Sequence, residues 1–433
     1  MPNGYTARIR QALLVLTVIP ALFTSHTFAA PTATLDIAQI AATIKAARPK
    51  VSDPQGWAND ILEALRANNL PRTPENICSV VAVTDQESAF AANPAVPNLG
   101  KLSQKAVISR LNQYPLLGGK AETLMYQLPN PRQNFMTRIR QAKTERDLDW
   151  AYRDLIASIA QAYKISFLMN SDMARDFIES RNEISTLGAM QVDVGFAVQQ
   201  ETARRGRALS LQEIYQLRDA LYTRKVGLYY GVARLLGYET GYGQKQYRFA
   251  DYNAGRYASR NAAFQTVVAS LAKQPLATDG DLLIYDRNGA ATATISNTEQ
   301  MVRLVADKYG LILPESRIRS DLLQEKTYAF NQTSTYHTVM EAYRLVKKSA
   351  PPYAVVPRIG LRSSKTSRLL TTERYANMVS KRYQRCMAQP ARTTTTTTSV
   401  QQPQQIKPPP APVATDPRPA PSFLQDWVNR QAI

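Results

Sequence analysis

Apolar residues recur at helical spacing along most of this chain, and this periodicity limits the fold more than any other feature of the sequence. Trp57, Ile61 and Leu65 repeat with a period of about 3.6 residues, and Asp53-Pro54 just before them is a typical helix start. Similar signals predict helices over 76–90, 103–113, 145–169, 297–309 and 334–348, and either one long helix or a broken pair over 210–236. We therefore expect a mainly α fold.

Few segments favour other structures. Asn288-Gly289 lies between the short apolar runs 282–285 and 292–295, and an Asn-Gly turn in that setting predicts one small β-hairpin. After residue 390 the composition changes to Thr, Pro and Gln. Such a composition cannot bury a core, so we predict a disordered tail over 391–433.

The amino terminus is typical of a secretory signal peptide. Arg8 and Arg10 precede an apolar stretch from Ala12 to Phe23, and cleavage is expected after Ala29. The alternative is an uncleaved anchor, but the apolar run is short for a span of roughly 20 residues. We predict that residues 1–29 are removed, that the mature chain has no transmembrane segment, and that the protein is exported, either periplasmic or associated with the cell envelope.

Export changes what the two cysteines, Cys78 and Cys386, imply. An even number of cysteines in an oxidising compartment permits a disulfide, and two buried free thiols are the alternative. Since His26 lies in the signal peptide, the mature chain has one histidine, His337, and zinc sites with several histidines are excluded. Cys78 lies in an apolar helix that does not favour a nucleophilic thiolate. We expect neither a metal nor another cofactor.

The formal net charge is +19, and much of the excess lies between residues 344 and 385, where Glu373 is the one acidic residue. This run predicts contact with an anionic envelope surface, and an ordinary solvated surface is the alternative. No signature of a DNA- or RNA-binding module is present, so no specific nucleic acid partner is expected.

The stretch VAVTDQESAF, residues 81–90, brings a carboxylate to the end of an apolar run. Either Glu87 is solvated at the surface, or it lies in an apolar cleft and keeps a proton near neutral pH. Asp85 lies about 200° away around a helix, so the two carboxylates are not expected to share a site.

Three motifs in one order resemble those of soluble lytic transglycosylases, which have a lysozyme-like fold and cleave the glycan strands of peptidoglycan. They are Glu87-Ser88-x-Phe90, Gly188-x-Met190-Gln191 and Tyr252-Asn253-Ala254-Gly255. The flanking sequence, over about 35–390, is similar to an uncharacterised bacterial envelope family described as a domain of unknown function. Ala189 and Asp251 depart from the usual motifs, and the 101 positions between Glu87 and Gly188 require a long insertion.

The resemblance implies an α+β lysozyme-like core within the mainly α chain, and a division into domains. These are an N-terminal helical segment (30–75), a catalytic domain (76–275) with a helical insertion (91–186), and a basic, mostly helical region (276–390). It also implies roles: Glu87 acts as acid and then base, and the substrate contacts are Ser88, Gly188, Met190, Gln191, Tyr252 and Asn253. Tyr238, Tyr242 and Tyr247 are candidates for stacking against sugar rings, and a structural role in the loop is the alternative.

Three alternatives stay open. Glu179-Ser180 is a second Glu-Ser pair, in a segment that looks like an exposed helix. A hydrolase of the goose-lysozyme type would need a carboxylate to position water, and Glu183 or Asp193 could serve. A scaffold that binds peptidoglycan without cleaving it would keep the fold and lack turnover.

Overall fold

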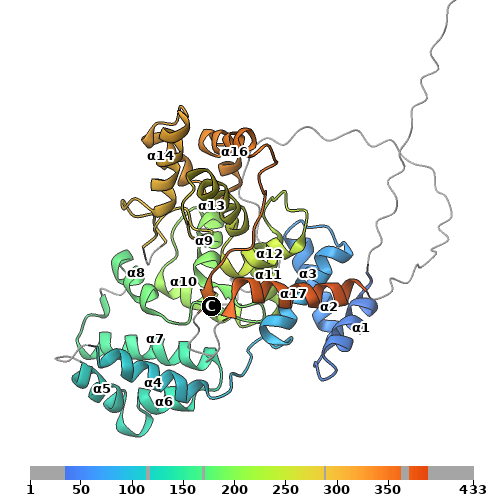
Figure 1. Cartoon of the computed structure of the whole chain (residues 1–433). Helices are drawn as coiled ribbons and strands as arrows, with labels where there is room; N and C mark the ends of the chain where they lie inside the picture. The colour runs from blue at the N-terminus through green and yellow to red at the C-terminus, as the bar shows by residue number, and fades with distance from the viewer. Residues whose placement is uncertain (1–34, 114–117, 168–170, 287–288, 362–369, 389–433) are drawn as a thin grey trace, which may run out of the picture.

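The computed structural model describes residues 35–113, 118–167, 171–286, 289–361 and 370–388. The predicted signal peptide and the predicted tail lie outside these residues. The described residues are mainly helical, which confirms the predicted fold class, and they are arranged around three hydrophobic cores (Figure 1). No helix among them is long and apolar enough to cross a membrane.

The central unit contains the largest core and joins segments from both ends of the described chain. It is built from α1 (Ile37–Ala47), α2 (Pro54–Ala67), α3 (Pro74–Ser88), β1 (Thr186–Leu187), β2 (Val192–Asp193), α9 (Val194–Arg205), α10 (Leu211–Leu221), α11 (Arg224–Leu236), α12 (Lys245–Ala254) and α17 (Thr372–Met387). The short antiparallel hairpin β1–β2 pairs Leu187 with Val192.

The insertion forms a second unit with a small core around Phe135, Met136 and Ile139. Its elements are α4 (Leu99–Leu111), α5 (Gly118–Gln127), the 3₁₀ turn η1 (Pro131–Gln133), α6 (Phe135–Gln141), α7 (Glu145–Ala162) and α8 (Asp172–Arg181). Helix α7 begins with a reciprocal cap, in which Thr144 and Asp147 satisfy each other's backbone N–H groups. In Figure 1, α7 lies between α10 of the central unit and helices α4 and α6.

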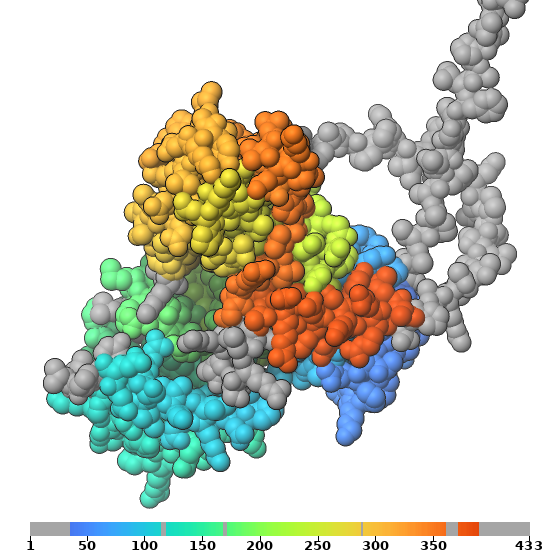
Figure 2. Space-filling view, in the orientation of Figure 1, coloured from blue at the N-terminus to red at the C-terminus, as the bar shows by residue number. Residues whose placement is uncertain are grey.

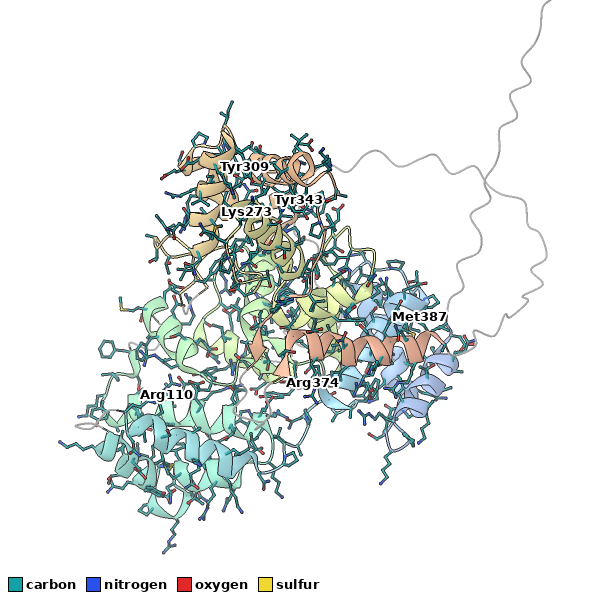
Figure 3. All side chains as sticks on the ribbon, in the orientation of Figure 1. Arg110, Lys273, Tyr309, Tyr343, Arg374 and Met387 are labelled. Carbon is teal, nitrogen blue, oxygen red and sulfur yellow. A yellow bond between two sulfur atoms is a disulfide. The ribbon has the colours of Figure 1, made fainter. Side chains whose placement is uncertain are left out.

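A third unit carries its own core around Phe264, Val305 and Phe330. It contains α13 (Ala258–Ala272), α14 (Asn297–Tyr309), α15 (Glu315–Leu322), η3 (Tyr328–Gln332) and α16 (Ser334–Lys347). Figure 3 labels Lys273, Tyr309 and Tyr343 in this unit and Arg110 in the insertion, at opposite ends of the view.

The cores group the chain differently from the predicted domains. Helices α1 and α2 share the central core with α3, so the described part of the predicted segment 30–75 packs with the predicted catalytic domain. Helix α17 was assigned to a C-terminal region, yet Tyr375, Ala376 and Val379 lie in the central core. Before α17, β3 (Gly360–Leu361) pairs with β4 (Leu370–Thr371).

Over 210–236 the structure has the broken pair of helices, α10 and α11, because Thr223 caps a new helix. Another expectation changes: of the β-hairpin predicted over 282–295, the described residues show the isolated bridge between Tyr285 and Ala291. The hairpin that lies near the motif residues is β1–β2, and its strands of two residues are too short to leave an alternating pattern.

Candidate functional site

Glu87 lies in the last turn of α3, and the chain stops the helix immediately after it. Ala89 and Phe90 both have left-handed backbone conformations, with φ of 51° and 64°. Phe90 is buried and packs edge-on against Trp57, with ring centroids 5.5 Å apart. This contact anchors the chain after the helix, so the half-buried Glu87 has a defined position.

Helix α17 packs along α3 and is covalently joined to it. Cys78 and Cys386 form a disulfide, the pairing that the sequence permitted. Buried Asp85 accepts hydrogen bonds from Arg48 and from Arg382 of α17. Because Cys78 meets the end of α17 while Glu87 meets its start, the two helices run in opposite directions. Asp85 is paired with these two arginines, so it does not share the site of Glu87, as predicted.

The start of α17 supplies a partner for Glu87. The buried Tyr375 hydroxyl donates a hydrogen bond to Glu87 Oε1 at 2.5 Å. Burial, and then the negative charge of Glu87, raise the pKa of Tyr375 well above its ordinary value. The phenol therefore stays protonated at physiological pH and remains a donor to the carboxylate.

The Gly188-x-Met190-Gln191 motif forms the turn of the β1–β2 hairpin. Gly188 has φ of +76°, and a Cβ there would lie 2.1 Å from the carbonyl oxygen of Leu221, so both backbone and space require glycine. Met190 is fully buried and packs against Gly231. The Tyr252 hydroxyl donates to the carbonyl oxygen of Met190 at 2.7 Å, which joins the second motif to the third.

The other motif residues connect this hairpin to neighbouring units. Gln191 Nε2 donates to Glu145 Oε2 of α7 at 3.1 Å, so the insertion contacts the motif directly. Asn253 Oδ1 accepts from the hydroxyl of Thr372, at the start of α17, at 3.1 Å. The structure thus gathers residues from α3, β1–β2, α7, α12 and α17 around Glu87 and Tyr252, which interact electrostatically.

Three residues predicted to contact substrate have structural roles instead. Met190 exposes 0% of its surface, so its side chain cannot line a cleft. Ser88 is buried, and its hydroxyl donates to the carbonyl of Thr84 within α3. Tyr252 is buried with its hydroxyl bonded to Met190, so it does not donate to Glu87. In each case the side chain is buried in the central core and does not face solvent.

Hydrogen bonds to Asp251 hold the tyrosine-rich loop after α11 in place, and the tyrosines are not arranged as a sugar-binding surface. Tyr238 and Tyr242 donate to Asp251 Oδ2 at 3.1 and 2.8 Å, so neither is arranged as an open stacking wall. The backbone N–H groups of Tyr257 and Ser259 donate to the same carboxyl. Burial raises the pKa of Asp251 to about 6 against these hydrogen bonds. The unusual Asp251 of the third motif thus ties α12 to α13.

The rival carboxylates have other partners. Glu179 is not on an exposed helix face as predicted: burial raises its pKa, and it pairs at 3.1 Å with the buried Arg218. Glu183 is largely exposed and pairs with Arg110. Asp193 caps α9 by accepting from the N–H of Phe196 at 2.7 Å, and it lies 3.9 Å from Arg234.

The described residues of the basic run over 344–385 have different surroundings. Arg344 pairs with Glu341 on α16, whereas Arg382 is paired with Asp85 beside the central core. Figure 2 shows α17 along the front of the molecule, adjoining the N-terminal helices coloured blue. Figure 3 labels Arg374 and Met387 near its two ends.

The sequence analysis missed Tyr375, Thr372 and Glu145. One signal was available for Tyr375, because it lies eleven positions before Cys386, about three helical turns, and so on the same face of a helix. Given the disulfide, this face had to approach α3. No comparable signal marked Glu145, whose contact depends on how the insertion folds. Among the described residues, no cluster of His, Cys, Asp or Glu is arranged to hold a metal ion.

Comparison with known proteins places the chain in a family. Residues 50–389 match the family described as "Protein of unknown function (DUF1615)". The "Uncharacterized protein YaiW" of Escherichia coli (strain K12) is 33% identical over 352 residues, which cover 81% of this chain and 90% of that relative. No solved structure matches significantly. The match over most of the chain means that this protein belongs to the DUF1615 family.

Proposed function

We propose that this protein is a peptidoglycan lytic transglycosylase, in which Glu87 cleaves the glycosidic bond between MurNAc and GlcNAc and leaves a 1,6-anhydro end. The observation that carries the proposal is the hydrogen bond from buried Tyr375 to Glu87, beside the hairpin and helix that carry the other two motifs. A carboxyl group held in a fixed orientation at the end of a buried helix suits acid–base catalysis.

The proposed reaction uses one carboxyl group twice. Tyr375 orients the carboxyl group of Glu87 through Oε1. The protonated carboxyl group gives its proton to the glycosidic oxygen as the bond to the anomeric carbon breaks. The carboxylate then removes the proton of the 6-hydroxyl group of the same sugar, whose oxygen bonds to the anomeric carbon and closes the 1,6-anhydro ring. No water is consumed, and no metal or cofactor takes part.

The surrounding contacts would hold the groups that the reaction needs. Thr372 and Asn253 fix the start of α17 against α12, which keeps Tyr375 over Glu87. Gln191 is held by Glu145 and by Thr186, whose hydroxyl donates to Gln191 Oε1 at 2.9 Å. We propose that Gln191 contacts the substrate from this fixed position, since it is the one side chain of its motif that keeps partial exposure beside the buried Met190.

A goose-type hydrolase is the second candidate, and one observation favours it. Asp193 and Glu87 both act electrostatically on Tyr252, so two carboxylates face the same tyrosine. In that mechanism Asp193 would position the attacking water. Glu183 is a weaker choice because it is exposed and paired with Arg110 on the insertion.

Digestion of purified sacculi tests the proposal. Wild-type protein and Glu87→Gln are incubated with sacculi, and the released muropeptides are analysed by mass spectrometry. We expect 1,6-anhydro products from the wild type and a loss of at least about 10³-fold with Glu87→Gln, because the acid is removed. Reducing ends that depend on Asp193 would favour the hydrolase. If the wild type binds glycan but does not cleave it, the non-catalytic scaffold is favoured. If Glu87→Gln is as active as the wild type, both the transglycosylase and the hydrolase mechanisms are contradicted.

A further inference from the structure

Trp150 is a partly exposed aromatic residue on α7 that is held in one orientation. Its side chain is 41% exposed, yet the indole Nε1 donates to Asp219 Oδ1 at 2.9 Å. Asp219 is in turn paired with the buried Arg153 at 3.0 Å. The guanidinium of Arg146 lies over the indole, 4.3 Å from its centroid. The ring therefore keeps open surface without the freedom of an ordinary exposed side chain.

The cation over this indole lies close to the motif hairpin. Arg146 follows Glu145, which accepts the hydrogen bond of Gln191. The guanidinium of Arg146 also lies 5.9 Å from the ring of Tyr222. Tyr222 follows Leu221, whose carbonyl oxygen is so near Gly188 that a Cβ there would lie 2.1 Å from it. The insertion thus brings Arg146, with Trp150 beneath it, toward the Gly188-x-Met190-Gln191 turn.

The chemistry of the pair suits one class of ligand. A fixed aromatic face with open surface suits stacking against the apolar face of a sugar ring. Arg146 adds a cation over the ring, and the residue is partly exposed. A guanidinium suits a carboxylate because it presents paired N–H donors. Peptidoglycan strands carry both groups, a sugar ring and acidic substituents on it.

We propose that Trp150 and Arg146 form a glycan-binding subsite on the insertion, with a sugar ring stacked on the indole and an acidic substituent of that strand facing the guanidinium. The choice of a glycan as ligand rests on the proposed function. The subsite gives the insertion a role in substrate binding, as an extension of the site around Glu87.

Fluorescence of Trp150 tests the contact directly. The chain has three tryptophans, Trp57, Trp150 and Trp427. In the variant Trp57→Phe, Trp427→Phe, Glu87→Gln, Trp150 is the single tryptophan and cleavage is blocked. Soluble uncross-linked glycan strands are titrated into this variant. We expect a saturable change in emission intensity and wavelength, since stacking removes solvent from the indole.

Calorimetry of single variants in the Glu87→Gln background measures the contribution to affinity and does not depend on the triple variant. Trp150→Ala is expected to weaken glycan binding about tenfold, whereas Trp150→Phe keeps most of the affinity because the aromatic face remains. Phe177→Ala is the matched control: Phe177 is 58% exposed and also lies under an arginine, Arg181, at 4.6 Å, but it is on α8, whereas Glu145, which contacts Gln191, is on α7. Its affinity should equal that of the parent.

The outcomes separate this inference from the proposed chemistry. Equal affinities of Trp150→Ala and Phe177→Ala, or no saturable emission change, overturn the subsite even if the wild type cleaves sacculi. A saturable Trp150 signal and a selective loss in Trp150→Ala support the subsite even if the wild type cleaves nothing. In that second case the catalytic proposal fails and the glycan-binding surface stands.

Discussion

Tyr375 reaches Glu87 from 288 positions further along the chain, and this single contact relates the basic C-terminal helix to the first motif. A buried phenol that donates to a carboxylate stabilises its ionised form, and hydrogen bonds to charged groups contribute about 1.5–3 kcal/mol. The sequence analysis treated the region of Tyr375 as a charged surface, so the contact became visible only when α17 was placed against α3.

Replacing Tyr375 with Phe is expected to lower sacculus cleavage by roughly tenfold or more at neutral pH, since a charge-assisted hydrogen bond is lost. The alkaline limb of the pH–rate profile should move to higher pH, because the ionised form of the Glu87 carboxyl loses stabilisation. Tyr383→Phe on the same helix is the control, since Tyr383 packs against Phe249 away from Glu87. An unchanged profile in Tyr375→Phe would contradict a role for its hydroxyl.

Gly188 and Gly206 offer a matched pair for measuring the closeness of the hairpin to α10. Both have left-handed φ, +76° and +69°, but a Cβ at Gly188 meets the Leu221 carbonyl while Gly206 has open space. Gly206→Ala should lower the free energy of unfolding by about 1 kcal/mol, the cost of the backbone conformation. Gly188→Ala should cost at least about 2 kcal/mol more in urea denaturation. Equal costs would show that the hairpin can move away from α10.

At the scale of elements, the pairing of α3 with α17 decides the site. The helix predicted over 76–90 is α3, which begins two residues earlier, after the cap at Thr73, and ends two residues earlier, with Glu87 in its last turn. Helix α14 begins and ends where predicted, at Asn297 and Tyr309. Helix α17 was missed because its exposed face is rich in charge and its apolar stripe, Tyr375, Ala376 and Val379, is narrow.

The disulfide between Cys78 and Cys386 is expected to hold α17 on α3. The pair Cys78→Ser, Cys386→Ser should lower the free energy of unfolding by about 2–5 kcal/mol, because the unfolded chain gains freedom. If the helices also loosen, cleavage should fall further than stability alone explains, since Tyr375 leaves Glu87. Thermal denaturation with and without reductant, followed by the sacculus assay below the melting range, measures both effects. Unchanged stability of the double variant would contradict this role.

At the scale of the whole molecule, three cores divide the chain into units that depend on one another to different degrees. The insertion is held to the central unit by buried charges, in which Arg218 bonds to Asp149 and to Glu179. Breaking such a network leaves an uncompensated charge, which costs more than the pair contributes. The unit of α13–α16 has a separate core. It also contains the fully buried carboxyl group of Glu325.

Glu325 gives the molecule a predicted pH dependence. Burial raises its pKa from 4.5 to about 7, although Tyr285 and the N–H of Leu282 donate to it. A raised pKa in the folded state means that this contribution to stability is present below pH 4.5 and is lost as the pH rises through 7. The loss is roughly 3 kcal/mol over that window.

Denaturant unfolding at pH 5 and pH 8 measures this effect. The wild type should lose more stability than Glu325→Gln between the two pH values, because glutamine resembles the protonated acid and does not titrate. Asp281→Asn should keep a smaller part of the pH dependence, since the charge of Asp281 helps to raise the pKa of Glu325 and burial raises the pKa of Asp281 itself. Parallel losses in the wild type and in Glu325→Gln would assign the pH dependence to other groups.

The sequence by itself determined the mainly helical class, the order of the three motifs and the cysteines available to join, because periodicity, helix caps and residue types are local properties. Only the tertiary structure decided which side chains meet. It placed Tyr375 on Glu87, buried Met190 and Tyr252 in the core, and brought Glu145 of the insertion to Gln191. These contacts join residues far apart in the chain, and their geometry depends on how whole helices pack, which no local pattern specifies.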